Sequence, residues 1–117
     1  MLAFDELGFL RARVAMRCSE LELTEAEVTG LMYPGLGSSA RDAEVRIRVL
    51  DELFTLLLIV PPEGRREWMR SPNRELGDSI PVDLASTFTS GVRAVRDVLR
   101  DMHDRSGSSG IEPGFGR

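Results

Sequence analysis

The amino-acid sequence predicts an all-α protein, a small bundle of about five to six helices. Apolar residues recur at helical spacing in several segments. Residues that begin helices, such as Thr24, Pro62 and Pro81, separate these segments. No segment shows the alternation of apolar and polar residues that is typical of a strand. The chain has 117 residues, of which 42% are apolar, so it is long enough for one domain with a modest core.

The first predicted helix covers residues 2–19. Its apolar side chains recur at helical spacing, and the interruption by Gly8 is mild, so we expect an amphipathic helix. The side chains of this apolar stripe are Leu2, Leu7, Leu10, Val14 and Cys18. We interpret Cys18 as a packed, unreactive thiol, and the alternative is a reactive cysteine.

A short second helix is expected after Thr24. Thr24 and Glu27 have the spacing of a capping box, in which each side chain caps the backbone amide of the other. The helix is expected to bury Val28 and Leu31. Because this pattern is similar to the opening helix of a helix-turn-helix, residues 1–38 are predicted to be a shortened region of that kind.

Residues 34–38 are predicted to form a loop, with Ser38 or Ser39 as the cap of the next helix. The segment 35–40 also fits G-x-G-x-x-A, a fingerprint of dinucleotide binding. That fingerprint requires a preceding strand and a βαβ unit. Because a helix is expected before the loop and no parallel sheet after it, we interpret the segment as a connection between helices and expect no cofactor.

The longest predicted helix covers residues 39–60 and begins the second region, residues 39–105. In its first half, an apolar stripe lies opposite a charged face. The stripe consists of Val45, Val49, Leu50 and Leu53, and the charged face of Arg46, Arg48 and Glu52. The second half, residues 54–60, is apolar nearly all round and therefore requires protein on every side. Either this half lies in the core, or one side of it contacts a second copy of the chain.

Pro61 and Pro62 are expected to end the long helix. Pro62 suits the first turn of a following helix, which is predicted to run through Met69. The only tryptophan of the chain, Trp68, lies near the end of this helix. Because large aromatic side chains usually pack, we expect Trp68 to anchor the core rather than to contact a partner.

A turn and a short helix are predicted next. Asn73 is expected to cap the turn with its side chain, and Gly77 to end it with a positive φ. Pro81 is expected to begin a short helix through Thr87.

The last predicted helix covers residues 90–104, and the composition from Ser106 onward indicates a flexible tail, residues 106–117. The apolar stripe of the helix consists of Val92, Val95, Leu99 and Met102, with Val98 beside them. Its other face alternates Arg with Asp at the spacing of helix ion pairs. We therefore interpret Asp97, Asp101, Asp104 and His103 as a solvated face; the alternative, a metal site, is disfavoured.

Composition and charge weigh against several classes of function. The net charge is −4, and the 15 basic residues, all Arg, are interleaved with 19 carboxylates, so no basic surface for nucleic acid is expected. The longest apolar run, residues 56–60, is too short for a membrane span, and the first residues do not resemble a secretory signal. The single cysteine fits the cytoplasm. No arrangement of catalytic side chains is recognisable, so we do not expect an enzyme.

One string of residues resembles a known family. It consists of Trp68-Met69, Ser71-Pro72-Asn73, Leu76-Gly77 and Pro81-Val82-Asp83-Leu84, followed by the last helix. Order and spacing are similar to those of the toxin-binding domain at the C-terminus of Xre/MbcA/ParS-type antitoxins. The resemblance covers about residues 45–104. Its family-motif residues are Trp68, Pro72, Asn73, Leu76, Gly77, Pro81, Asp83 and Leu84.

The resemblance implies the antitoxin of a type II toxin–antitoxin system, which binds and neutralises a cognate toxin. In this family the usual partner is a RES-domain toxin, an enzyme that consumes NAD, and the antitoxin covers the entrance to its active site. Family members also carry a helix-turn-helix that represses their own operon. Here that region is shortened, and the segment 39–44 is acidic, which weighs against operator binding. The alternatives are a DNA-binding regulator and an orphan interaction module.

Five residues are expected to contact the partner. Arg70 and Arg74 lie within the family string, and Ile111, Phe115 and Arg117 lie in the predicted tail. Such a tail becomes ordered only at an entropic cost, but it is able to fill a groove on the partner. The alternative is a tail that stays disordered.

Overall fold

The computed structural model of the protein describes residues 5–32 and 39–111, with side chains up to residue 105. Its described residues form six α-helices and two 3-10 helices and no strand, which confirms the all-α prediction. An isolated bridge joins Asn73 to Ser79. In chain order the elements are α1 (Glu6–Glu20), α2 (Glu25–Met32), α3 (Ala40–Leu56), η1 (Leu57–Ile59), α4 (Pro62–Arg70), η2 (Arg74–Leu76), α5 (Pro81–Thr87) and α6 (Thr89–Ile111).

Local capping chemistry begins two of the helices where the sequence predicts it. At α2, the amide of Glu27 donates to the Thr24 hydroxyl at 3.1 Å, and the Thr24 amide donates to the Glu27 carboxylate at 2.8 Å. At α3, Ser39 and Asp42 form the same reciprocal arrangement. The capping box at Thr24 and the cap at Ser39 are therefore confirmed.

The long helix is interrupted before residue 60. The α-helix α3 ends at Leu56, and its last turn tightens into the 3-10 helix η1. Pro61 and Pro62 follow, and proline has no amide hydrogen to continue the ladder of a helix. Pro62 lies in the first turn of α4, as predicted.

The apolar segment 54–60 is covered on one side only. Phe54 and Leu57 are buried in the core of the chain itself, whereas Thr55 is exposed and the side chain of Leu58 is 42% exposed. The expectation that protein surrounds this segment on every side is thus not met within the described chain. A second copy of the protein on the Leu58 side stays a prediction.

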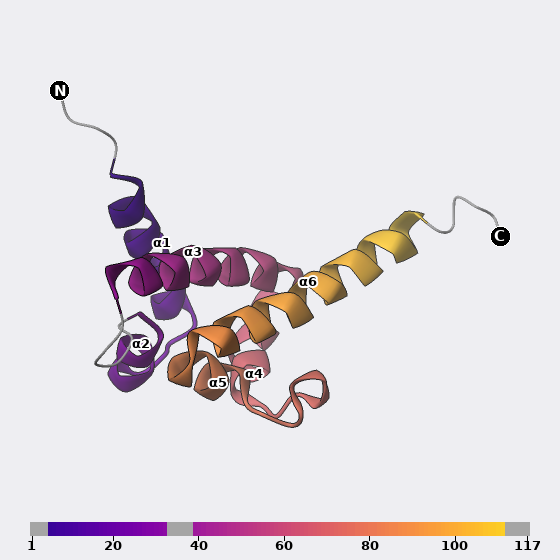
Figure 1. Cartoon of the computed structure of the whole chain (residues 1–117). Helices are drawn as coiled ribbons and strands as arrows, with labels where there is room; N and C mark the ends of the chain where they lie inside the picture. Colours follow the sequence, from indigo (N-terminus) through magenta and orange to yellow (C-terminus); the bar gives the residue numbers. More distant parts are fainter. Residues whose placement is uncertain (1–4, 33–38, 112–117) are drawn as a thin grey trace.

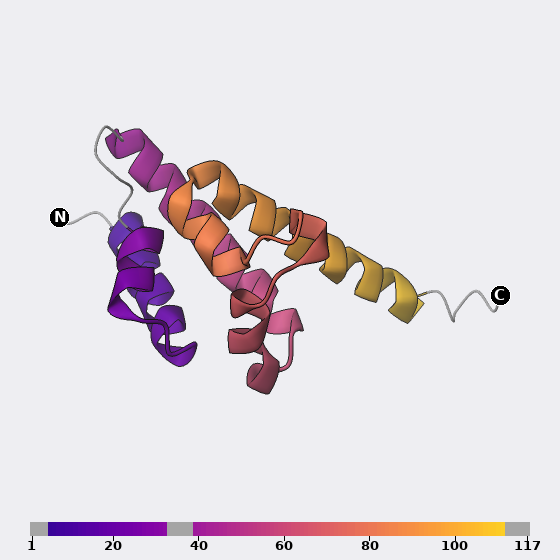
Figure 2. The same ribbon diagram turned by 90° about the horizontal axis from the view of Figure 1, so that it is seen from below.

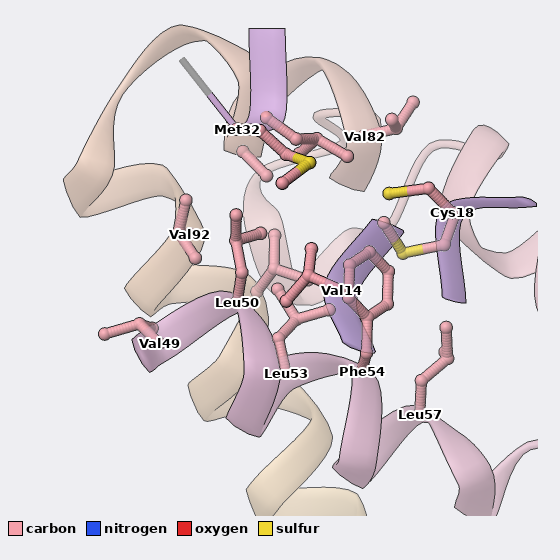
Figure 3. Packing of buried hydrophobic residues seen from close by; sticks show 14 of the residues in the cluster. Val14, Cys18, Met32, Val49, Leu50, Leu53, Phe54, Leu57, Val82 and Val92 are labelled. Atoms are coloured by element: carbon pink, nitrogen blue, oxygen red, sulfur yellow. The ribbon is translucent and has the colours of Figure 1, made fainter. Parts of the chain in front are cut away.

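A single hydrophobic core contains residues from all six α-helices. Its buried members include Val14, Leu31, Leu50, Val82, Val92 and Leu99. Figure 3 shows side chains from α1, α2, α3, α5 and α6 pointing into one interior. The core thus draws on both sides of the predicted boundary between residues 38 and 39, and a division into two regions stays a prediction.

The helix α6 projects from the body of the molecule (Figure 1). Its first part lies against α3 and α5, while α1 and α2 lie at the far end of the molecule from its C-terminus (Figure 2). The helix runs to Ile111 and not to the predicted end at residue 104. Glycines in the segment after residue 105 weaken a helix by about 1 kcal/mol each without forbidding it, and the first proline comes only at Pro113.

Ion pairs connect α6 to α3. The Glu52 carboxylate accepts from Arg96 at 2.8 Å and also pairs with Arg100. In the apolar stripe of α6, Val92, Val95 and Leu99 are fully buried as predicted, whereas Met102 is half-buried. None of the helices in residues 5–32 and 39–111 is long and apolar enough to cross a membrane.

Candidate functional site

The segment from the end of α4 to the start of α6 contains the family string. At its beginning, Trp68 is half-buried and packs against the core, whereas its neighbour Met69 is fully buried. The anchoring function predicted for Trp68 is therefore shared with Met69, which is the deeper of the two. Pro72, which follows the helix, is exposed.

A compact turn follows α4. The side-chain oxygen of Asn73 accepts from the Glu75 amide at 2.9 Å, and the Asn73 carbonyl accepts from the Asp78 amide at 2.9 Å. Gly77 has a φ of 65°, so both the predicted cap and the predicted positive φ are confirmed. Asp78 is also left-handed, with a φ of 67°. Aspartate tolerates this backbone better than most residues, because its short side chain bonds locally.

The short helix α5 leads from this turn to α6. It begins at Pro81 and ends at Thr87, as predicted. Asp83 is exposed in its first turn, where a carboxylate interacts favourably with the helix dipole. Leu84 is half-buried against the core. Of the motif residues in α5, Asp83 is thus an exposed charge, whereas Pro81 and Leu84 are buried or half-buried.

Close contacts hold α5 in place from two sides. A Cβ atom at Gly30 would lie 2.9 Å from the Cβ of Ser86, so α2 approaches α5 more closely than a larger residue permits. A Cβ atom at Gly91 would overlap the carbonyl oxygen of Leu84, so α6 packs directly on the α5 backbone. Both contacts require glycine. They fix the position of α5 relative to its neighbours.

Arg46 also holds α5 in place. The sequence predicted it on the charged face of α3, and that prediction was wrong. The sequence pattern assigns it to the solvated face of α3, but the residue is only 2% exposed. Its Nη1 atom donates to the carbonyl oxygens of Leu31 at 3.0 Å and Ala85 at 2.8 Å. These carbonyls lie in the last turns of α2 and α5, where a helix leaves its carbonyls without partners and favours a cation. Burial lowers the pKa of the Arg46 guanidinium.

A surface groove lies beside α5, with a volume of about 350 Å³. Its lining residues are Asp78, Ser79, Ile80, Asp83, Leu84, Thr87 and Phe88. Phe88, the residue between α5 and α6, is 57% exposed. Neither Phe88 nor Asp78 is among the residues singled out from the sequence. One feature of the sequence could have indicated that Phe88 is exposed: it lies between two helical segments and outside the apolar stripe of each.

The arginines predicted to contact a partner have different environments. Arg70 pairs with Glu27 of α2 at 2.7 Å, and its side chain is 31% exposed. Arg74 is exposed and forms no ion pair with the described residues. Ile111 ends α6, while Phe115 and Arg117 lie outside the described residues. Contact with a partner stays a prediction for all five residues.

The other candidates from the sequence do not form a functional site in the described part of the chain. Cys18 is buried, and burial raises the pKa of its thiol to about 11, as expected for an unreactive cysteine. His103 is exposed on α6, and no group of three or more potential ligands for a metal occurs in the described residues. Helices flank the segment 35–40, which itself lies mostly outside the described residues.

Comparison with known protein families finds a match that lies within residues 39–105. Residues 49–104 match the antitoxin Xre/MbcA/ParS C-terminal toxin-binding domain. The match begins within α3, ends within α6, and includes the turn, α5 and the groove. No curated protein and no solved structure matches the chain.

Proposed function

Because residues 49–104 belong to the antitoxin Xre/MbcA/ParS C-terminal toxin-binding domain family, we propose that the protein is the antitoxin of a type II toxin–antitoxin pair in the bacterial cytoplasm. It acts by holding a toxin protein rather than by catalysis. The family match is the observation that supports this proposal most strongly.

The toxin we propose is a RES-domain enzyme that consumes NAD. This follows from the resemblance, in which such enzymes are the usual partners, and the antitoxin covers their active-site entrance. The fold supports a covering function in one respect. The helix α6 extends away from the body as far as Ile111 (Figure 1), so the end of this helix is able to reach into a cleft of another protein.

Co-expression tests the proposal. Induction of the toxin encoded beside this gene is expected to stop growth and to deplete NAD, and co-expression of this protein is expected to restore both. The two proteins are expected to purify together. Growth arrest that persists despite a soluble antitoxin, together with the absence of a complex, would show that the proposal is wrong. Rescue without any effect of the toxin on NAD would contradict only the RES assignment.

Regulation of its own operon is the alternative function of the protein. The first turn of α2 carries Glu25, and that of α3 carries Asp42, which are charges that repel phosphates. Operator binding is therefore not the function that these helices favour. A salt-dependent shift of the upstream DNA by the protein, alone or with its toxin, would reverse this ranking.

A further inference from the structure

The groove beside α5 combines an apolar floor with two carboxylates. Ile80, Leu84 and Phe88 supply the apolar side chains, and Asp78 and Asp83 supply the charges. Phe88 has the highest exposed fraction, 57%, among the large hydrophobic residues that the structure describes as exposed. Exposed aromatic residues in a groove are a common feature of protein-binding surfaces.

Among the described residues, no cation pairs with the two carboxylates of the groove. Asp78 and Asp83 are both exposed, and neither forms an ion pair within the described parts of the chain. None of the arginines that the structure describes lines the groove. A ligand that complements this surface carries a positive charge.

Contacts within the chain itself fix the shape of the groove. Gly91 lets α6 pack directly on Leu84, and Arg46 fixes the carbonyl of Ala85. The hydrogen bonds around Asn73 fix the turn that carries Asp78. A preformed surface loses little conformational freedom on binding, which favours affinity.

We propose that this groove docks a segment of the toxin in which an Arg or Lys is adjacent to an apolar side chain. The apolar side chain packs against Phe88, and the cation lies near the carboxylates of Asp78 and Asp83. The inference rests on the proposed antitoxin function and adds the surface and the chemistry of contact. It concerns residues other than the arginines and the tail that the sequence had suggested.

Two variants test the groove: Phe88→Ala, and Asp78→Asn combined with Asp83→Asn. The probe is the toxin encoded beside this gene, inactivated by mutation and titrated calorimetrically. Phe88→Ala is expected to weaken the Kd about 30-fold, as for an aromatic residue central to an interface. The double Asn variant is expected to weaken it about tenfold at low salt and less at high salt, because salt screens the lost attraction.

Matched controls separate contact from folding. Met16→Ala removes an apolar side chain that is 50% exposed on α1, and Glu63→Gln removes an exposed first-turn carboxylate on α4. Both are expected to bind as the unchanged protein does. Circular dichroism and urea midpoints establish that each variant is folded. If Phe88→Ala unfolds, it is replaced by Phe88→Leu, which is expected to weaken the Kd about fivefold.

The outcomes distinguish the two proposals. If the unchanged protein binds the toxin and both groove variants bind equally well, the groove inference is wrong and the antitoxin function stands. If the unchanged protein does not bind, both fail. If Phe88→Ala instead changes the oligomeric state of the protein alone, the groove is an interface between copies of the chain, which also overturns the inference.

Discussion

The guanidinium of Arg46 connects the carboxyl ends of α2 and α5, which lie far apart in the chain. Its bonds to the carbonyls of Leu31 and Ala85 are buried. Arg46→Met keeps much of the volume but leaves these carbonyls without a donor. We expect the free energy of unfolding to fall by about 3 kcal/mol. Urea denaturation followed by circular dichroism measures this change.

Arg41 is the control for this substitution. It lies on the same helix and is exposed, so Arg41→Met is expected to change the free energy of unfolding by less than about 0.5 kcal/mol. Equal effects of the two substitutions would show that the bonds of Arg46 do not stabilise the fold.

Gly91 is the residue at which α6 meets the backbone of α5. An added Cβ would overlap the Leu84 carbonyl oxygen, so one helix has to move. We expect Gly91→Ala to lower the free energy of unfolding by about 1–3 kcal/mol. In Gly64→Ala, by contrast, the Cβ would lie 3.6 Å from Val60, an ordinary contact, and helix propensity is expected to raise stability by about 0.5 kcal/mol. Thermal unfolding of both variants measures the difference, and a stabilised Gly91→Ala would contradict the close approach.

At the scale of elements, the features that were predictable from the sequence are those set by local chemistry. Thr24 and Ser39 cap helices through residues three positions away, and Pro62 and Pro81 restrict their own backbone. Gly77 ends a turn for the same local reason. The family string could be read because it consists mostly of such residues.

The rest of the site depends on which elements meet in space. The stripe pattern of α3 cannot show that the ends of two other helices converge on Arg46. Nor does the sequence around Gly91 and Phe88 show that α6 packs on α5 and leaves an aromatic ring beside a groove. These features follow from tertiary packing, and periodicity within one helix carries no information about them.

The connection between α2 and α4 supplies a prediction about elements. Glu27 accepts from the Thr24 amide at 2.8 Å and from Arg70 at 2.7 Å, so one carboxylate caps α2 and links it to α4. We expect a double-mutant cycle of Glu27→Ala and Arg70→Ala to give a coupling energy of about 0.5–1 kcal/mol, because the pair is partly buried.

The pair Arg66–Glu22 is the control for this cycle. Its atoms are 3.5 Å apart, and both side chains are more than half exposed, at 52% and 72%. Its coupling is expected to be near zero. If the Glu27–Arg70 coupling energy is no larger than that of the control, the pair does not stabilise the fold. Arg70 is then available for the contact with a partner that the sequence suggested.

At the scale of the whole molecule, the core contains residues from every α-helix, and this predicts one cooperative unfolding transition. The chain carries its own probes on both sides of the boundary between residues 38 and 39. Trp68 reports by fluorescence on the part of the chain after residue 38. Cys18 reports on the N-terminal region, because the residue is only 1% exposed and burial raises the pKa of its thiol to about 11, so labelling at pH 8 requires unfolding. We expect the urea midpoints of tryptophan emission and of pulsed thiol labelling to coincide. Separate midpoints, with Cys18 labelled first, would show that residues 1–38 unfold as a unit of their own and that the core continues without α1 and α2.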